Sequence, residues 1–335
     1  MAVAAGESVA PRSLLSIVLD CHNCPNHLFG SQTAESYVPF HLHLQPLTAQ
    51  IGFIPADVLA AIKQDQSHTF THNGEWSRVG LNSRLDTFQK RSDALNAVAR
   101  EWKRAGLFSS VLDGWRDEMY AVYSSERHPY MSWAEVKAIR PHASAFEFER
   151  AACALLGLAT FGVHLTAYTS DDTRGVRIWT PRRAKNKATW PGYLDNSVAG
   201  GITSGDGPWE SIIRECWEEA GLPDEVVRPR LRQAGVITYV YRTPQGYLQP
   251  EIEYVYELPL PLEVRPRPID GEAEDFQLWG LDEIRQRMQT GEFKPNSALV
   301  IIDFLIRHGA ITAETEPRYI EIVSLLHNNL GLPGP

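Results

Sequence analysis

Residues 200–222 read GGITSGDGPWESIIRECWEEAGL, a glycine-rich segment followed by a short run with helical periodicity. Glu215, Glu218 and Glu219 stand at positions i, i+3 and i+4, so they share one helical face. An apolar stripe at helical spacing marks another face: Trp209, Ile212, Ile213, Cys216, Trp217 and Ala220. Three carboxylates one turn apart repel each other unless a cation lies between them, and carboxylate oxygens are preferred ligands of Mg²⁺ and Mn²⁺. The stretch therefore predicts an amphipathic helix that binds a divalent metal.

The residues around this helix fit the same interpretation. Pro208 suits a first helical turn, either Asp206 or Gly207 can cap the helix, and Gly221 can end it. We expect a tight turn at Gly200, with its carbonyl oxygen directed at a metal. Arg214 can pair with Glu218 or with Glu215 and so hold a carboxylate in the conformation of a ligand.

Composition limits the classes of function. The chain has 335 residues, 43% of them hydrophobic and 22% charged, which is typical of a globular protein with one large or two ordinary domains. A net charge of −9 argues against nucleic acid or an anionic membrane as the main partner. No run of 18 apolar residues is present, so we expect no membrane span. Residues 1–12 lack the features of a secretory signal and are expected to form a disordered tail. We therefore expect a cytoplasmic monomer or homodimer with a small-molecule partner.

Cysteine usage adds one question. Cys21 and Cys24 form a C-x-x-C pattern close to two histidines, which can bind zinc or undergo redox chemistry. A structural zinc site needs a second ligand pair, and none occurs at a suitable spacing. Reduced thiols of a cytosolic protein are the favoured interpretation.

The first part of the chain predicts an α+β unit over residues 13–150. Its expected elements are a helix or strand at 14–20, strands within 41–54 that are interrupted at Pro46, a helix opened by Pro55, a hairpin turning at Asn73–Gly74, a helix over 90–105 capped by Ser92 or Asp93, a strand at 119–123 and a helix over 146–156.

The second part, residues 151–335, carries the motif. Paired strands are expected at 162–168 and 176–180, and further strands at 234–241 and 251–257. Helices are expected from about residue 281, over 296–307 and over 319–327.

Two charged segments flank the acidic helix. The basic segment 181–187, PRRAKNK, is either a solvated loop or a phosphate-facing loop in which Arg182, Arg183 and Lys187 bind substrate. The acidic segment 270–278, DGEAEDFQL, offers Glu272 and Glu274 as a further metal ligand or the general base; a flexible acidic loop is the alternative.

The spacing of the central motif resembles the Nudix box, G-x₅-E-x₇-R-E-U-x-E-E-x-G-U, where U is a bulky aliphatic residue. Asp206 stands where that family usually has Glu, and Cys216 fills the first aliphatic position. The resemblance implies a Nudix α/β/α sandwich with a mixed sheet, preceded here by the smaller α+β unit. It also implies metal-dependent hydrolysis of a diphosphate linkage. The implied site residues are Gly200, Glu215, Glu218 and Glu219 as ligands of Mg²⁺ or Mn²⁺, with Arg214 orienting them.

The resemblance extends beyond the box. Residues 148–168, 190–206, 270–279 and 293–309 resemble a Nudix subfamily with an N-terminal extension, which in some fungi is fused to thiamine diphosphokinase. This implies hydrolysis of oxidised or damaged thiamine diphosphate, such as the oxo and oxy forms, to the monophosphate and phosphate. Two alternatives remain: a Nudix diphosphatase for a nucleoside diphosphate derivative, such as ADP-ribose or a nucleotide sugar, and a non-hydrolytic ligand-binding module.

Overall fold

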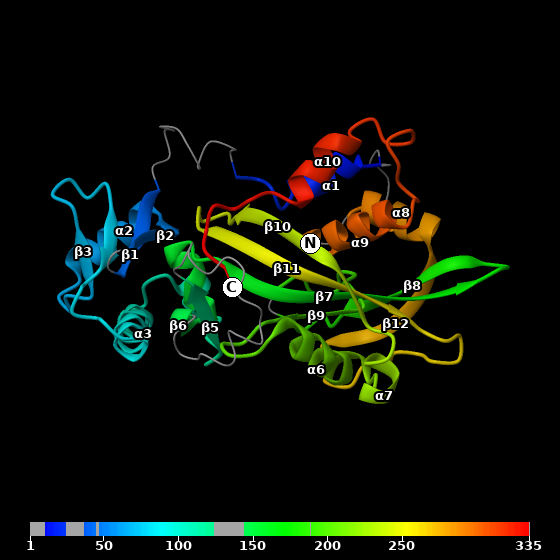
Figure 1. Ribbon diagram of the computed structural model, residues 1–335, viewed down its shortest axis with the longest axis horizontal. Helices are drawn as coiled ribbons and strands as arrows, with labels where there is room; N and C mark the ends of the chain where they lie inside the picture. The colour runs from blue at the N-terminus through cyan, green and yellow to red at the C-terminus, as the bar shows by residue number, and fades with distance from the viewer. Residues whose placement is uncertain (1–10, 25–36, 45–46, 124–143, 188, 335) are drawn as a thin grey trace.

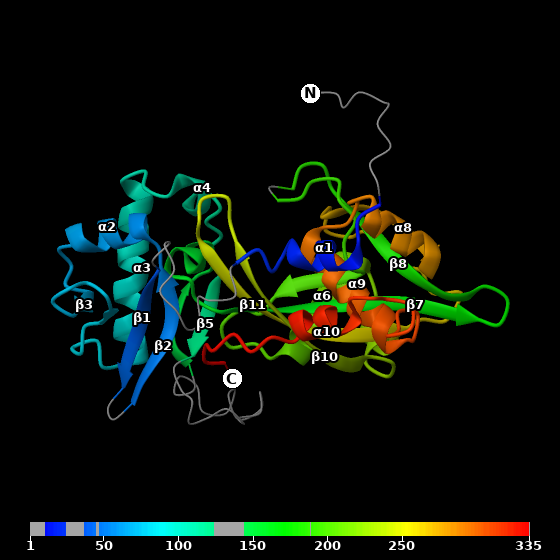
Figure 2. The same cartoon turned by 90° about the horizontal axis from the view of Figure 1, so that it is seen from above.

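The chain is described by a computed structural model that covers residues 11–24, 37–44, 47–123, 144–187 and 189–334. Ten of the twelve residues expected to form a disordered tail lie outside these ranges. Elements from the first part of the chain gather at one end of the molecule, beside a larger mixed sheet with helices on both faces (Figures 1 and 2). Within the described ranges, no helix is both long and apolar enough to span a membrane.

In the described part of the chain, the N-terminal elements form two small sheets and three α-helices around one core of buried residues. A sheet of order β2-β1-β4-β3 packs with α2 and α3, while β5 and β6 pair separately. The elements are β1 Val38–Leu44, β2 Leu47–Ile54, α2 Ala56–Gln64, β3 Phe70–His72, β4 Val79–Leu81, α3 Phe88–Arg104, α4 Ser109–Leu112, β5 Met119–Tyr123 and β6 Ser144–Glu149. The strands predicted on either side of Pro46 and the hairpin predicted at Asn73–Gly74 are confirmed.

Helix α3 begins earlier than its sequence predicts. Its N-cap is Thr87, whose Oγ1 accepts a hydrogen bond of 3.2 Å from the Lys90 amide. The expected caps, Ser92 and Asp93, lie inside the helix, so that part of the prediction is wrong. Ser92 instead donates its hydroxyl to the Phe88 carbonyl within the same helix.

The helix predicted over 146–156 is also wrong in its first half. Phe146 and Phe148 are buried on one face of β6, because alternate residues of a strand point the same way. A 3₁₀ helix, η1 (Arg150–Leu156), follows and ends at Gly157 with φ of 57°. Its residues are buried in the N-terminal core, so packing carries the N-terminal unit past the expected boundary at residue 150.

The larger sheet has the order β10-β11-β7-β8-β12, and β9 also pairs with β7. Strands β11 and β7 are parallel, whereas the other pairs are antiparallel, so the sheet is mixed as expected. The strands are β7 Thr160–Asp171, β8 Gly175–Arg183, β9 Val198–Gly201, β10 Arg232–Arg242, β11 Leu248–Pro259 and β12 Ala273–Gly280. Most of the acidic segment 270–278, for which a flexible loop was one alternative, is therefore strand β12.

Helices cover both faces of this sheet, which completes an α/β/α sandwich (Figure 1). On one face α6 (Pro208–Ala220) buries Ile212, Ile213 and Cys216, with α7 (Asp224–Val227) alongside. On the other face lie α8 (Leu281–Gln289), α9 (Pro295–Arg307) and α10 (Tyr319–Leu326). Helix α1 (Leu14–Leu19) packs with this second group rather than with the N-terminal core.

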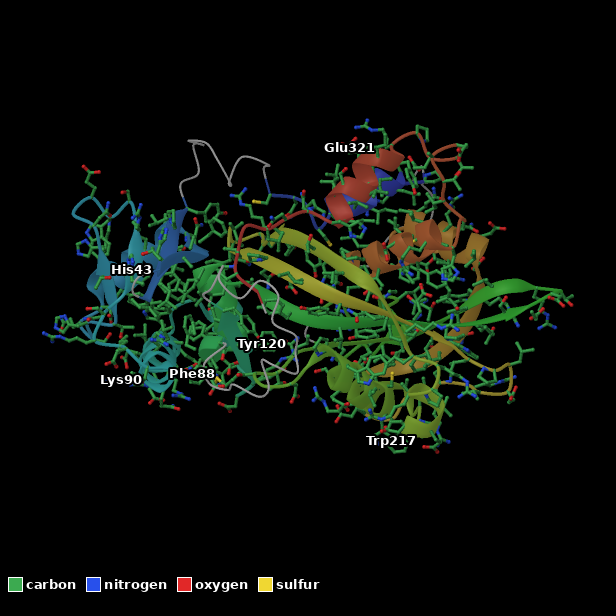
Figure 3. All side chains as sticks on the ribbon, viewed as in Figure 1. His43, Phe88, Lys90, Tyr120, Trp217 and Glu321 are labelled. Atoms are coloured by element: carbon green, nitrogen blue, oxygen red, sulfur yellow. The ribbon has the colours of Figure 1, made fainter. Side chains whose placement is uncertain are left out.

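The apolar stripe predicted on α6 is only partly buried. Trp217 is 51% exposed and lies on the outer side of the helix (Figure 3), and Trp209 is exposed too. The rest of the stripe faces the sheet, so the helix still presents one apolar and one acidic side.

Candidate active site

Helix α6 begins and ends where its sequence predicts. Gly207 is the N-cap without a side-chain hydrogen bond, and Pro208 occupies the first turn. Gly221 adopts a left-handed φ of 61°, and its amide donates to the Trp217 carbonyl at 3.0 Å. Asp206 does not cap the helix; it accepts a hydrogen bond of 2.6 Å from Arg214 Nη1. Arg214 thus connects the segment before α6 to the middle of the helix.

Gly200 and Gly201 end strand β9 and do not form the expected turn. A Cβ built on Gly200 would lie 2.4 Å from Glu215 Cδ, closer than two such atoms approach in folded proteins. Only glycine therefore lets the Glu215 carboxylate reach the backbone of β9. This contact places the expected carbonyl ligand, on Gly200, next to the first carboxylate of the helix.

Glu219 is anchored to the same strand. Its Oε2 accepts a hydrogen bond of 2.9 Å from the Ala199 amide. Burial raises the pKa of Glu219 well above its usual value, although the hydrogen bond from Ala199 lowers it. The negative charges of Glu215, Asp195 and Glu272 raise the pKa further. The carboxylates of α6 and of the segment before β12 are therefore within electrostatic reach of one another.

A small pocket lies between α6, β8 and β12. The residues that line it are Pro181, Arg183, Asp195, Asn196, Ser197, Glu219, Glu272, Ala273 and Phe276. It therefore brings together one carboxylate of α6, Glu219, one cation of the basic segment, Arg183, and one carboxylate of the acidic segment, Glu272.

The other two helix carboxylates differ in exposure. Burial raises the pKa of Glu215, and the negative charges of Glu218 and Glu272 raise it further. The positive charge of Arg214, which lies 3.3 Å away, lowers it. The side chain of Glu218 is half exposed, and its Oε2 lies 3.8 Å from Arg214 Nε. Both pairings proposed for Arg214 are therefore present.

These residues fit a divalent cation by their chemistry. Glu215, Glu218, Glu219 and the Gly200 carbonyl would supply only oxygen ligands, which Mg²⁺ and Mn²⁺ prefer. Burial raises the pKa values of Glu215 and Glu219, and neighbouring carboxylates raise them further. A cation would neutralise the negative charge of these carboxylates. Among the residues the structure describes, no three His, Cys, Asp or Glu side chains converge into a ready-formed metal site. The carboxylates are gathered, but they are held by Arg214 and the Ala199 amide rather than pointed at one centre.

The basic segment is divided by the sheet. Arg183 lines the pocket, and its Nη1 donates to Asp195 at 2.6 Å. Arg182, which directly precedes Arg183 in β8, points to the opposite face of the sheet. There its Nη1 donates to the Gly192 carbonyl at 2.8 Å, and its Nη2 lies 3.6 Å from Glu292. The structure therefore brings Arg183 to the pocket and does not bring Arg182, contrary to its expected substrate-binding role.

The acidic segment is divided in the same way. Glu272 lines the pocket, and its Oε2 lies 2.6 Å from Lys187 Nζ, which also brings Lys187 to the site. Glu274 is exposed at the point where the register of β12 against β8 shifts. Glu272 is thus the better placed of the two candidates for a ligand or general base.

Sequence reasoning missed a buried polar residue in this pocket. Asp195 accepts from Arg183 and from the Ser297 hydroxyl. Burial raises the pKa of Asp195, but Lys294 and Arg183 outweigh it and lower the pKa to about 2. The signal was the polar run Asp195–Ser197 within a segment otherwise rich in apolar residues.

A second polar cluster lies on the α9 face of the sheet. Glu253, only 3% exposed, accepts from the Tyr239 hydroxyl at 3.0 Å and lies 3.5 Å from His164. The amide of Asn296, on α9, donates to the Tyr239 hydroxyl at 3.1 Å. Glu253 Oε2 and Asn296 Oδ1 are buried acceptors without a hydrogen-bond partner within the described ranges. We call Glu253, Tyr239, His164 and Asn296 the acceptor cluster.

Two family models match this sequence. Residues 16–160 match a domain of unknown function, DUF4743, and residues 162–299 match the NUDIX domain.

Three known proteins are similar to this chain over most of its length. The uncharacterized protein YJR142W of Saccharomyces cerevisiae is 35% identical over 297 residues, covering 85% of this chain and 82% of that protein. Nudix hydrolase 20, chloroplastic, of Arabidopsis thaliana is 31% identical over 306 residues, covering 89% of this chain and 75% of that protein. Nudix hydrolase 24, chloroplastic, of the same plant is 30% identical, with 89% and 75% covered.

Solved structures resemble the C-terminal part. The NUDIX domain of Shewanella oneidensis NrtR, complexed with ADP ribose, matches with a TM-score of 0.36 and 13% identity, covering 46% of this chain and 90% of that one. The MutT protein of Methanosarcina mazei matches with a TM-score of 0.34 and 16% identity, covering 45% and 95%.

Proposed function

Because this chain belongs to the Nudix hydrolase family, we propose that it hydrolyses the diphosphate of thiamine diphosphate derivatives, with Mg²⁺ or Mn²⁺ as cofactor. The favoured substrates are the oxo and oxy forms, and the products are the monophosphate and phosphate. The activity would remove damaged cofactor. We place it in the cytoplasm; the two Arabidopsis relatives carry the word chloroplastic in their names.

The observation that carries the proposal is the contact of two α6 carboxylates with strand β9. Glu215 packs against Gly200, and Glu219 accepts from the Ala199 amide. Both carboxylates have raised pKa values chiefly because they are buried. Buried carboxylates with raised pKa values gather at functional sites, and all three helix carboxylates of the motif are present, which favours hydrolysis over the non-hydrolytic alternative.

The charged residues of the site divide the chemistry of this proposal between them. A bound divalent cation would neutralise the diphosphate and lower the pKa of an attacking water. Glu215, Glu218, Glu219 and the Gly200 carbonyl would hold the cation, and Arg214 would orient Glu215 and Glu218.

The residues around the cation would handle the phosphates and the proton. Arg183 and Lys187 lie where they can contact phosphate oxygens, and their present partners, Asp195 and Glu272, keep them there. Glu272 would act as a further ligand or take a proton from the attacking water.

The acceptor cluster supports a substrate with N–H donors. Apart from Asn296, the cluster lies in the same sheet as the strand that carries Gly200. Glu253 of β11 pairs with Gly162 of β7, and Gly162 pairs with Gly201 of β9. The buried acceptor oxygens of Glu253 and Asn296 would receive hydrogen bonds from a ring that carries an amino or amide N–H. The pyrimidine ring of both thiamine derivatives carries such a donor.

The test is a substrate panel. Phosphate release should be measured with Mg²⁺ and with Mn²⁺ for thiamine diphosphate, oxothiamine diphosphate, oxythiamine diphosphate, ADP-ribose and nucleotide sugars. We expect kcat/KM to be highest for the oxo or oxy form. A higher kcat/KM for ADP-ribose or a nucleotide sugar would replace the thiamine assignment with the nucleoside diphosphate alternative.

A further inference from the structure

The N-terminal unit reaches the metal-binding strand through one side chain. Consecutive residues of a strand face opposite sides, so Gly200 and Gly201 present their Cα atoms in opposite directions. Gly200 faces Glu215, whereas a Cβ on Gly201 would lie 1.7 Å from the hydroxyl oxygen of Tyr120. The end of β9 is therefore held between a carboxylate of α6 and a tyrosine of β5. Figure 3 shows Tyr120 on the side of the N-terminal elements that adjoins the larger sheet.

Neighbouring contacts hold β5 against the segment that follows β9. The Ser204 amide donates a hydrogen bond of 2.7 Å to the Met119 carbonyl. The Thr203 hydroxyl lies 3.5 Å from Glu118 Oε1. Thr203 and Ser204, which lie between Gly200 and Asp206 of the Nudix box, are thus attached to the N-terminal unit.

Tyr120 is itself held in place. Its side chain is 6% exposed, and the Arg150 guanidinium lies 5.3 Å from the centre of its ring. Arg150 forms an ion pair of 2.9 Å with Glu118, and its amide donates to the Glu118 carbonyl at 2.8 Å. Burial and the contact with Arg150 therefore hold the ring of Tyr120 in one position against Gly201.

We propose that Tyr120 is a positioning residue for the metal site, so that the N-terminal unit completes the catalytic site of the C-terminal domain. The contact with Gly201 limits the movement of its backbone, which matters because glycine has more conformational freedom than any other residue type. It thereby fixes the direction of the Gly200 carbonyl and the distance of β9 from Glu215. This inference rests on the proposed function, because it assigns a role toward the same metal.

The experiment measures Mn²⁺ binding by calorimetry and by the electron paramagnetic resonance of free Mn²⁺, using the full chain without substrate. The Tyr120→Ala variant should bind Mn²⁺ about 10- to 100-fold more weakly than the unchanged chain, the range typical of lost support behind a ligand. Tyr120→Phe keeps the ring and its contact with Arg150, and should lose about threefold.

A matched control separates positioning from general loosening of the contact between the two units. Tyr247, in the hairpin of β10 and β11, is also buried in the N-terminal core and donates to Asp57 of α2 at 2.9 Å. Tyr247→Ala should lower the melting temperature but leave Mn²⁺ affinity within twofold. An equal loss of affinity in Tyr247→Ala would overturn the proposal.

The outcomes also separate this inference from the proposed function. No Mn²⁺ binding by the unchanged chain would refute the metal site itself. Binding by the unchanged chain, with equal affinity in a folded Tyr120→Ala variant, would refute only the role of Tyr120. If Tyr120→Ala does not fold, Tyr120→Phe decides: unchanged affinity in that variant would overturn the inference.

Discussion

Arg214 Nη1 donates a hydrogen bond of 2.6 Å to Asp206 Oδ2, which lies eight positions earlier in the sequence. The same guanidinium lies 3.3 Å from Glu215 and 3.8 Å from Glu218. Asp206, which stands in the usual position of a glutamate, is therefore long enough to hold the arginine that orients two helix carboxylates. Its role in this structure is to anchor Arg214, not to cap α6.

Removing this anchor should lower turnover while the chain stays folded. We expect Asp206→Ala to decrease kcat about 10- to 100-fold, because Arg214 loses its strongest partner and the carboxylates lose their orientation. Asp206→Glu should stay within about threefold, since it keeps the carboxylate. Steady-state kinetics check this, with Asp224→Ala as control, because Asp224 forms an exposed pair with Arg228 elsewhere on the surface. Equal activity in Asp206→Ala and Asp224→Ala would contradict the role.

The close contact between β9 and α6 predicts that Gly200 cannot be replaced. In Gly200→Ala the new methyl group would meet Glu215 Cδ at 2.4 Å, so the carboxylate must move away from the strand. We expect kcat to fall at least about 100-fold and Mn²⁺ affinity to fall with it. Gly280→Ala is the matched control, because a Cβ there meets no atom within 4 Å. Normal metal affinity in a folded Gly200→Ala variant would argue against this geometry.

Two neighbouring arginines should differ in their effect on substrate binding. Arg183 lines the pocket and Arg182 lies on the opposite face of the sheet. Arg183→Ala should raise KM about tenfold or more, through loss of a charged hydrogen bond worth about 1.5–3 kcal/mol. Arg182→Ala should change KM less than threefold. If the two variants raise KM equally, Arg183 is not a specific phosphate contact.

Stability should depend on pH through Glu251. Burial, together with the charge of Glu253, raises the pKa of Glu251 to about 8, despite the opposing charges of Lys294 and Arg150. Between the ordinary pKa of about 4.5 and this value, the folded chain keeps a proton that the unfolded chain releases. The free energy of unfolding contributed by Glu251 therefore falls as pH rises through this window.

Thermal melting of the metal-free chain between pH 5 and 8.5 checks this prediction. Glu251→Gln should flatten the fall of melting temperature with pH, because the amide carries no proton to lose. Glu225→Gln, at an exposed position in α7, should leave the slope as it is in the unchanged chain. Identical slopes in all three chains would show that Glu251 does not titrate in this range.

The sequence was most informative where the spacing of side chains is set by one element. Local periodicity and glycine chemistry predicted the ends of α6, its acidic side and the pairing of Arg214 with Glu215 and Glu218. Each of these features is present. The mixed sheet and both helical layers, which are present, were expected from the resemblance to the Nudix box. The alternating and helical patterns of the C-terminal part predicted individual strands and helices.

The features that were missed depend on contacts between distant segments. Arg182 and Arg183 look equivalent in the sequence, and only the pairing of β8 with β12 sends them to opposite faces. Asp195 becomes important because folding brings it to Ser297 and Arg183. Gly200 and Gly201 resemble a turn in the sequence, yet they belong to a strand because they pair with Val163 and Gly162 of β7.

The most direct test of the central claim uses Glu219, whose carboxylate faces the pocket while it accepts from the Ala199 amide. Mg²⁺-dependent phosphate release from oxothiamine diphosphate should be compared for the unchanged chain, Glu219→Gln and Glu210→Gln. Glu210 is on the same helix but pairs with Arg228 on the surface. We predict that Glu219→Gln lowers kcat at least about 100-fold, that Glu210→Gln stays within twofold, and that chelation of Mg²⁺ abolishes the reaction. Phosphate release that persists in Glu219→Gln, or without divalent metal, would contradict the account.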